Sequence, residues 1–389
     1  MLKIGVIGYG LQASTIAKMI GNYDVPYCLS AICDPRIAEI KAENDRFLKN
    51  TSFYLEVDQL LAEEKLDGLI IGTTCNLHSE MACKAARLNI PVFLEKPVAI
   101  NFEQIKKLHA NYKLSSGKIM VSLPMRLCPL MKTVKEIIDS GVIGSVEQIV
   151  AHNDVGYGEI YFTTWYRDYS KTGDLFLQKA VHDFDYISYL IGSKPKWIAA
   201  MKARRIFGGN KPFSLCCRDC NEQKECPESP YNMFRERGRA ENVRQLEQVR
   251  NNQRMCIFSE GIKHQDMGEC LIEYENGAQS SYTQNFFVRN KAHRRGGRIY
   301  GYKGTIEYDF KGLINVFNHR SSRVDRIEMS PPGSHYGGDT ELVYDFLMLM
   351  TEGKMPRTSL KTGIWGTLTA LYAIQSSTNN IFCEVILPE

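Results

Sequence analysis

Two glycines near the start of the chain stand where a phosphate group could approach the backbone. The loop Gly8-Tyr-Gly-Leu-Gln-Ala13 follows an apolar, β-branched run and precedes an amphipathic stretch. Gly8 permits a tight turn, Gly10 lets backbone N–H groups come close to a pyrophosphate, and Ala13 allows a helix to pack closely on a strand. The helix N-terminus would add partial positive charge. This loop in its strand–helix context predicts a dinucleotide-binding site.

An acidic residue stands where such a site needs one. Asp34 ends a second apolar run, roughly 20 residues or a little more after the glycines, and is expected to hydrogen-bond the adenosine ribose. This carboxylate favours NAD as the cofactor. Arg36 leaves NADP open, because an arginine at this place can accommodate a 2′-phosphate.

A lysine follows a later strand of the same half of the chain. In Leu94-Glu95-Lys96-Pro97 the strand ends, and open α/β sheets bind ligands beyond the carboxyl ends of their strands. Lys96 can therefore approach both a nicotinamide and a reacting oxygen. Partial burial and the cationic ring would lower its pKa and fit it for acid–base chemistry. Pro97 is expected to fix the turn, and a cis peptide bond is one way to do so.

A histidine on a predicted helix is the second chemical element. The helix is expected from about Leu175 to Ile191, which puts Gln178, Lys179 and His182 on one side, because residues three and four apart share a helix face. Histidine titrates near physiological pH, so His182 is the natural acceptor of a proton from an alcohol that loses hydride. Asp185 is expected to orient its imidazole.

A cluster of cysteines interrupts the second half of the chain. Clustered thiols in a cytosolic protein favour metal binding over disulfides. Cys217, Cys220, Cys226 and Cys256 are the predicted ligands of a structural zinc ion, and an iron–sulfur cluster would use the same residues. Free thiols or redox-active pairs are the alternatives. The arginine-rich segment 234–254 that lies within this insert is expected to be a solvated helical excursion, and its interleaved glutamates argue against nucleic acid.

Bulk properties predict a folded protein of two domains. The 389 residues exceed one ordinary domain, and 44% hydrophobic with 24% charged residues is typical of globular chains. A net charge of +4 gives no general argument for nucleic acid or a membrane surface. No apolar run reaches the ~20 residues that span a bilayer. Because the first residues run straight into a strand, with no room for a signal peptide, we expect a cytoplasmic protein.

The order of predicted elements gives the fold class. Strands and helices alternate over residues 1–122, which predicts an α/β Rossmann domain with a doubly wound parallel sheet. Residues 123–389 predict an α+β domain with an open, mostly antiparallel sheet, interrupted by the cysteine insert at about 208–260. The turn Glu275-Asn-Gly277 is a strong hairpin signal. Two closing helices, about 340–351 and 362–376, are expected to pack back on the first domain.

Several short motifs occur in the order found in one known family. They are the glycine loop, Glu95-Lys-Pro97, Met125-Arg126-Leu-Cys-Pro129, Gly141-Val-Ile-Gly144, His182–Asp185, Gly301-Tyr-Lys-Gly-Thr-Ile306 and His335-Tyr-Gly-Gly-Asp339. The chain thus resembles the glucose–fructose oxidoreductase/inositol dehydrogenase (Gfo/Idh/MocA) family. The resemblance implies hydride transfer between nicotinamide and a secondary alcohol or ketone of a sugar, cyclitol or glycoside. It also implies a substrate domain that forms homo-oligomers, dimers or tetramers.

The resemblance carries over Lys96 and His182 as catalytic residues. Many members have aspartate one helical turn before the histidine, where this chain has Gln178, so Lys179 either supplies a second cation or faces solvent. Aromatic residues between Tyr157 and Tyr166 are expected to line the sugar site. The expected cofactor-binding residues are Gly8, Gly10, Leu11, Gln12, Ala13, Asp34, Arg36, Thr73, Asn76, His78, Glu95 and Lys96; the expected substrate-binding residues are Arg126, Trp165, Gln178 and His182.

Two other functions fit the same residues. Transient oxidation next to an acidic C–H would let a glycosidic bond break by elimination, with the cofactor restored afterwards. A catalytically decayed, cofactor-binding regulator is the third interpretation, against which the presence of both Lys96 and His182 argues.

Overall fold

The computed structural model describes the chain except residues 44, 113–117, 231, 234–253, 331–332 and 389, so the predicted excursion at 234–253 lies outside the described residues. The N-terminal part forms a parallel six-stranded sheet in the order β3-β2-β1-β4-β5-β6. Its strands are β1 (Leu2–Ile7), β2 (Tyr27–Cys33), β3 (Ser52–Tyr54), β4 (Gly68–Ile71), β5 (Val92–Leu94) and β6 (Ile119–Val121).

The helices of this domain connect the strands in the predicted alternation. They are α1 (Leu11–Met19), α2 (Ile37–Ala42), α3 (Val57–Glu63), α4 (Cys75–Ala86) and α5 (Phe102–Tyr112). The strand order reverses between β1 and β4, and ligands of such sheets bind at that switch point. The predicted Rossmann domain is confirmed, although sequence analysis missed β3, β6 and α2. These elements span three to six residues, too few for a periodic signal.

The second sheet has nine strands in the order β14-β13-β12-β11-β7-β10-β9-β8-β15. All neighbours are antiparallel except β10 and β7, which confirms the predicted, mostly antiparallel character. The strands are β7 (Val146–Asp154), β8 (Pro195–Ala203), β9 (Met267–Tyr274), β10 (Gln279–Asn285), β11 (Arg294–Gly301), β12 (Gly304–Asp309), β13 (Leu313–Asn318), β14 (Val324–Glu328) and β15 (Cys383–Glu384). The predicted hairpin turn is present between β9 and β10, where Gly277 has a φ of +86°.

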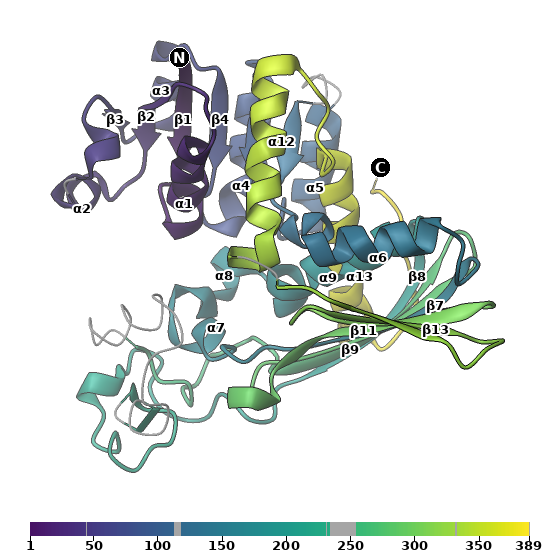
Figure 1. The fold of residues 1–389 in the computed structure, drawn as a ribbon. Helices are drawn as coiled ribbons and strands as arrows, with labels where there is room; N and C mark the ends of the chain where they lie inside the picture. Colours follow the sequence, from purple (N-terminus) through teal and green to yellow (C-terminus); the bar gives the residue numbers. More distant parts are fainter. Residues whose placement is uncertain (44, 113–117, 231, 234–253, 331–332, 389) are drawn as a thin grey trace.

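Helices cover one face of this sheet, as Figure 1 shows. They include α6 (Pro129–Asp139), α9 (Val181–Ile191) and α13 (Leu360–Asn379), while the short α7 (Ile160–Thr163) and α8 (Tyr169–Thr172) lie between the sheet and the first domain. Buried aromatic residues of α9 and the sheet, Phe184, Tyr186, Tyr282 and Tyr308, share one apolar core with α13. This core fixes α9, and with it His182, against the sheet.

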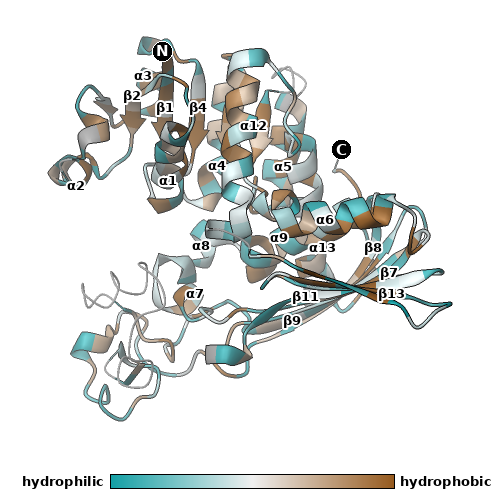
Figure 2. Cartoon of the chain, viewed as in Figure 1, coloured by the Kyte–Doolittle hydropathy of each residue, from teal (hydrophilic) through white to brown (hydrophobic). Residues whose placement is uncertain are grey.

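The closing helix α12 (Gly338–Glu352) packs on the first sheet. Its residues Leu342, Val343 and Phe346 share an apolar core with Ile4 and Val6 of β1, and Phe346 meets Phe93 edge-on at 5.7 Å between ring centroids. The apolar strands β1 and β4 lie inside this layer in Figure 2. Because α12 belongs to this core, the residues just before it are held beside the Rossmann switch point. In the described part of the chain, no helix is long and apolar enough to cross a bilayer.

Candidate active site

The glycine loop has the backbone geometry that a dinucleotide site requires. Gly8 has a φ of +81°, and a Cβ there would lie 2.6 Å from the Thr73 backbone nitrogen, so only glycine fits. Gly10, with a φ of −78°, is different, because the nearest atom to an added Cβ is Gly72 O at 3.8 Å. Sterics within the protein therefore do not demand glycine at position 10. The open space there suits the close approach of a pyrophosphate.

The N-terminus of α1 opens onto this space. The first N–H groups of a helix, here from Leu11 onward, have no intrahelical acceptors and can bind an anion. Leu11 is half exposed, and among the described residues the Gln12 Nε2 has no hydrogen-bond partner although it is buried. Ala13 packs against Gly72. A Cβ added to Gly72 would lie 2.5 Å from the Cβ of Ala13, so the helix and the strand are packed as closely as predicted. The loop and helix therefore fit the expected cofactor.

Asp34 lies at the carboxyl end of β2, beside the glycine loop, as predicted. Its Oδ2 accepts a hydrogen bond from the Tyr9 backbone N–H at 2.9 Å. Arg36 also pairs with it, with Nη2 3.0 Å from Oδ2 and Nε 3.1 Å from Oδ1. Burial acts to raise the pKa of Asp34, but the bonds from Arg36 outweigh it and leave the pKa below its usual value, so the carboxylate stays ionised. Arg36 is thus directed at Asp34.

The residues after β4 border the same switch point. Thr73 and Asn76 are half-buried, and the Thr74 hydroxyl donates to Asn76 Oδ1 at 2.8 Å. His78 is buried, with Nδ1 2.7 Å from Pro97 O and Nε2 3.1 Å from Thr73 O. Both ring nitrogens of His78 thus face backbone carbonyls, so this residue ties the loop after β4 to the turn after β5. Its predicted contact with the cofactor stays a prediction.

Lys96 reaches from the first domain to the helix that carries His182. Its Nζ donates a hydrogen bond to Gln178 O at 2.7 Å, across 82 positions of sequence, and the Lys96–Pro97 peptide bond is cis. Burial lowers the pKa of Lys96, against the opposing effect of Cys75 and Glu95. Glu95 is also buried, and burial raises the pKa of its carboxyl to about 7. The lysine is therefore poised for proton exchange in a dehydrated setting.

The helix before His182 is wider than predicted. The expected plain α-helix from Leu175 is wrong in its first turn, because Phe176–Ala180 is a π-helical turn in which the Val181 N–H donates to Phe176 O. Gln178 O accepts the Lys96 bond within this turn. The Gln178 side chain donates to Thr172 O and Cys75 Sγ, so its amide is used inside the protein. Wide turns of this kind often occur at functional sites.

Lys179 points inward, which excludes the solvent-facing alternative. It is 6% exposed, and its Nζ donates to the Tyr157 hydroxyl and lies 4.8 Å from the centre of that ring. Burial acts to raise the pKa of Tyr157, but the neighbouring cations, Lys179 first among them, outweigh it and leave the pKa below its usual value. Sequence analysis placed Tyr157 only within a general aromatic segment. The structure shows that it pairs with Lys179.

His182 is buried beside a second histidine. Its ring centroid lies 5.6 Å from that of His335, and among the described residues its Nδ1 has no hydrogen-bond partner. Burial holds the pKa of His182 well below its ordinary value, with Lys96 and His335 adding to the effect, so the imidazole is neutral. A neutral, unpartnered imidazole can accept a proton.

The segment before α12 supplies His335. Its Nδ1 lies 3.0 Å from both carboxylate oxygens of Asp339, one helical turn later. His335 and Tyr336 adopt left-handed backbone angles, with φ of 46° and 55°, which costs roughly 1–3 kcal/mol each. Sequence analysis used this segment only as a family motif, although the His–Asp spacing of four was a usable signal. The fold holds a strained turn that presents His335 to His182.

Asp185 does not orient the imidazole of His182, so that expectation is wrong. Its carboxylate pairs with Arg126, with Nη2 2.6 Å from Oδ1 and Nε 2.8 Å from Oδ2. The Arg126 guanidinium also lies over the Tyr189 ring, 5.0 Å from its centre. This fork ties the turn η3 (Pro124–Leu127) to α9. Substrate binding by Arg126 stays a prediction.

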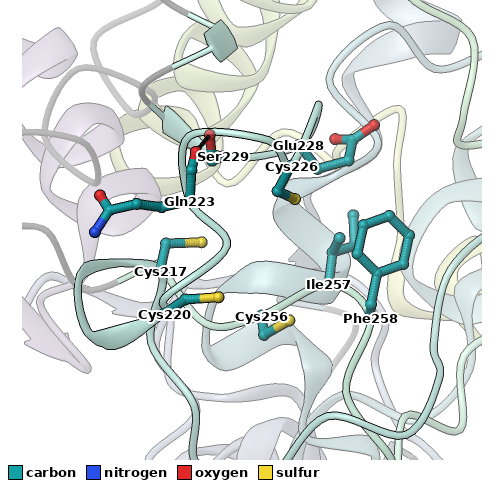
Figure 3. A pocket seen from close by; sticks show the side chains of 9 residues that line it. All are labelled: Cys217, Cys220, Gln223, Cys226, Glu228, Ser229, Cys256, Ile257 and Phe258. Atoms are coloured by element: carbon teal, nitrogen blue, oxygen red, sulfur yellow. Dashed lines mark hydrogen bonds between the residues drawn. The ribbon is translucent and has the colours of Figure 1, made fainter.

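The remaining predicted residues lie further from this cluster or in the insert. Trp165 is 46% exposed and stacks on Tyr166 at 4.1 Å between ring centroids. In the described part of the chain, no group of three or more His, Cys, Asp or Glu side chains is arranged as a metal site. The four predicted metal-binding cysteines do, however, line one small cavity (Figure 3).

Comparison with known proteins decides the family. Residues 2–123 match the family model described as the oxidoreductase family with an NAD-binding Rossmann fold, and residues 131–307 match that of the GFO/IDH/MocA C-terminal domain. The chain belongs to the Gfo/Idh/MocA family. It is therefore an oxidoreductase with an NAD-binding domain, as predicted.

Relatives of this Gfo/Idh/MocA protein include some that are named oxidoreductases and some that are named dehydrogenases. The oxidoreductase YteT of Bacillus subtilis (strain 168) is 24% identical over 86% of this chain and 83% of its own length. The myo-inositol 2-dehydrogenase of Thermotoga maritima is 24% identical over 51% of this chain and 58% of its own. A levoglucosan dehydrogenase solved with NADH and levoglucosan has a TM-score of 0.74 at 18% identity, over 99% of both chains, which is a likeness of fold.

The two glycines offer a direct test of the cofactor site. Gly8→Ala should destabilise the protein by about 1–2 kcal/mol, because the alanine would be strained and would meet the Thr73 backbone. Gly10→Ala should keep the wild-type melting temperature but weaken NAD binding at least ~10-fold, measured by titration calorimetry. Undiminished NAD binding by a folded Gly10→Ala variant would contradict the site.

His78 predicts a pH dependence of stability. Burial lowers its pKa to about 4, against 6.5 in the unfolded chain, so the unfolded state binds more protons between these values. Stability contributed by neutral His78 is full above pH 6.5 and is lost as the pH falls towards about 4, up to roughly 3 kcal/mol. His78→Asn, which keeps an N–H donor, should flatten the fall of the melting temperature over this window. An unchanged slope would show that His78 is not buried neutral.

Proposed function

We propose that this protein transfers hydride between a nicotinamide cofactor and a secondary alcohol or ketone of a sugar, cyclitol or glycoside. The observation that carries the proposal is the bond from Lys96 Nζ to Gln178 O. It brings an ammonium group at the end of a Rossmann strand onto the helix turn just before His182. Lys96 is the second cause, after burial, of the lowered pKa of His182, which supports their closeness.

The buried groups have complementary roles in oxidation of the alcohol. His182, neutral and with an unpartnered Nδ1, would accept the hydroxyl proton. Lys96 would stabilise the oxygen as its negative charge develops, since a preorganised cation acts strongly in a dehydrated site. When bound, the nicotinamide accepts the hydride at C4. In the reverse direction His182 would return the proton.

Lys179 and Tyr157 would take the place of the family's usual aspartate. An aspartate would add negative charge, whereas the Lys179–Tyr157 pair gives a hydroxyl beside an ammonium group. Tyr157 would hydrogen-bond the reacting oxygen or a neighbouring hydroxyl of the substrate. His335, oriented by Asp339, would be a further proton carrier next to His182.

The state of Asp34 supports NAD over NADP. Its carboxylate is ionised and would repel a 2′-phosphate, while it can accept a bond from a ribose hydroxyl. Arg36, the residue that left NADP open, is paired with that carboxylate and is half exposed. NADP binding would require Arg36 to leave Asp34.

The experiment compares single variants with the wild-type protein on a set of candidate substrates. Myo-inositol, levoglucosan, D-glucose and nitrophenyl glucosides are tested with NAD and with NADP for NADH or NADPH formation and for release of nitrophenol. On any substrate turned over, Lys96→Met and His182→Asn should lower kcat by about 10²–10⁴ and leave the NAD-induced rise in melting temperature unchanged.

Lys171→Met serves as the matched control, because Lys171 is half exposed on α8 and pairs with Asp168 at the surface. Near-wild-type turnover by either site variant would remove that residue's role. Release of nitrophenol with no net NADH would replace net oxidation by the elimination route. If neither NAD nor NADP raises the melting temperature of the wild type, the proposal fails, and the alternative of a cofactor-binding regulator fails with it.

The outer face of the nine-stranded sheet is proposed to join two copies of the chain. Exposed apolar side chains occur on three of its strands: Val150 on β7, Met201 on β8 and Leu271 on β9. An open sheet face with such residues suits burial against an equivalent face. We expect the purified protein to sediment as a dimer or tetramer, and Leu271→Arg to shift it towards the monomer. A monomeric wild type at micromolar concentration would contradict this.

A further inference from the structure

The cysteine insert contains a small cavity lined by four thiols. Cys217, Cys220, Cys226 and Cys256 border it, and their sulfur atoms lie around the same space in Figure 3. The structure contains no disulfide among the described cysteines, since all twelve are free. The cavity offers about 20 Å³ to a water-sized group, which is close to the space of one water molecule or ion.

Backbone contacts hold the four thiols in this arrangement. Cys217 begins the 3₁₀ turn η6 (Cys217–Asp219), and the Cys220 N–H donates to Cys217 O at 3.3 Å, which closes a tight C-x₂-C turn. Cys256 lies on a separate segment, and its backbone N–H donates to Leu215 O at 2.8 Å. An isolated antiparallel bridge between Cys216 and Met255 fixes the two segments side by side. Hydrogen bonds between these two segments therefore hold the thiols near one another.

The surrounding charges are arranged for an anionic centre. Arg254 is 3% exposed; among the described residues its Nε has no hydrogen-bond partner, and its Nη2 forms a long ion pair with Glu228 Oε2 at 3.9 Å. The Cys217 N–H donates to Arg254 O at 2.8 Å, and Arg254 is close enough to Cys217, as Arg167 and Lys211 are to Cys256, for their charges to act on these sulfur atoms. Glu228 also lines the cavity but pairs with Arg289 at 3.3 Å. The cations are therefore placed to stabilise negative charge on sulfur, and the carboxylate that lines the cavity has a partner of its own.

We propose that Cys217, Cys220, Cys226 and Cys256 bind one structural zinc ion. Four thiolates at ~2.3 Å in a tetrahedral arrangement are a common structural zinc set, and C-x₂-C is a usual ligand spacing. The cavity has room for a single ion. Since no group of side chains in the described part of the chain is already arranged as a metal site, binding would bring the four sulfur atoms together through rotation of the cysteine side chains.

Proton and charge balance fit this site. Each of the four thiols must lose its proton to become a zinc ligand. Binding Zn²⁺ releases four protons and leaves a centre of net charge −2. Arg254, Arg167 and Lys211 offset that charge. The buried guanidinium of Arg254 thereby gains acceptors.

A zinc ion here would stabilise the insert against the active-site wall. The insert contributes little regular structure between residues 208 and 230, so its apolar contacts alone provide a weak anchor. The Met255 N–H donates to Thr163 O at 2.9 Å, and Arg167 donates to Ser259. Thr163 and Arg167 belong to the segment that continues from Tyr157. The metal would fix this segment without touching the substrate.

The test measures metal content in the full-length protein purified without chelator. We expect about one zinc per chain by mass spectrometry, with four thiols that react with Ellman's reagent only after the metal is removed. Replacement by Co²⁺ should give the visible bands of tetrahedral cobalt–thiolate coordination. Cys217→Ser and Cys256→Ser should each lower the zinc content more than about tenfold and lower the melting temperature.

Cys216→Ser is the matched control, because Cys216 adjoins Cys217 but its sulfur lies 3.5 Å from Met255 Sδ and does not line the cavity. It should keep the wild-type zinc content. Zinc-free wild-type protein whose insert thiols react with Ellman's reagent without prior metal removal, and which shows no tetrahedral cobalt bands, overturns the proposal. Iron with acid-labile sulfide, or a disulfide within the insert, overturns it as well. These readouts are independent of dehydrogenase activity, so they also stand if the proposed function fails.

Discussion

The site depends on one contact between the domains, the hydrogen bond from Lys96 Nζ to Gln178 O. The lysine is positioned by β5 and by His78, which contacts the carbonyl of the following proline. The acceptor carbonyl belongs to a π-helical turn, which the aromatic core of the second sheet holds in place. The Lys96 ammonium group and the Gln178 carbonyl are thus each held in place by the packing of their own domain. A change in the packing of either core would move the ammonium group relative to His182.

Electrostatics inside this site are dominated by cations in a dehydrated space. Burial is the first cause of the lowered pKa of His182, and Lys96, Arg295 and Lys179 add to it. Two groups offset this positive charge: Tyr157, whose pKa is lowered, and Asp339, which pairs with His335. Such a site favours neutral imidazole and stabilises negative charge that appears on a substrate oxygen. The proposed substrate, an alcohol that loses a proton and a hydride, fits such a site better than a molecule that already carries a positive charge.

Three distant parts of the chain build the site, and each is anchored in a different way. The Rossmann loops are fixed by a parallel sheet, and the His182 helix by aromatic packing on the second sheet. The third part, the strained turn at His335 and Tyr336, is held because α12 packs on the first sheet. The insert lies beside the segment that continues from Tyr157, so its own stability affects the substrate side of the site. The relative positions of the candidate site residues therefore depend on the packing of both sheets and of α12.

The sequence alone determined the Rossmann domain, the mostly antiparallel second sheet, the cofactor loop, and the choice of Asp34, Lys96 and His182 as candidate site residues. The fold, the cofactor loop and Asp34 follow from local patterns, namely glycine spacing, strand–helix alternation and residue types at strand ends. Lys96 and His182 were chosen as catalytic candidates because the order of the short motifs resembles that of one family. Tertiary structure decided the partners. In the folded chain Asp185 pairs with Arg126, and Lys179 points inward and donates to Tyr157. The helix forms a π-helical turn at Gln178, and His335 lies next to His182. Such contacts join residues that are far apart in the chain or depend on a turn that periodicity treats as regular. Side-chain partners are set by packing in three dimensions, about which local spacing carries no information.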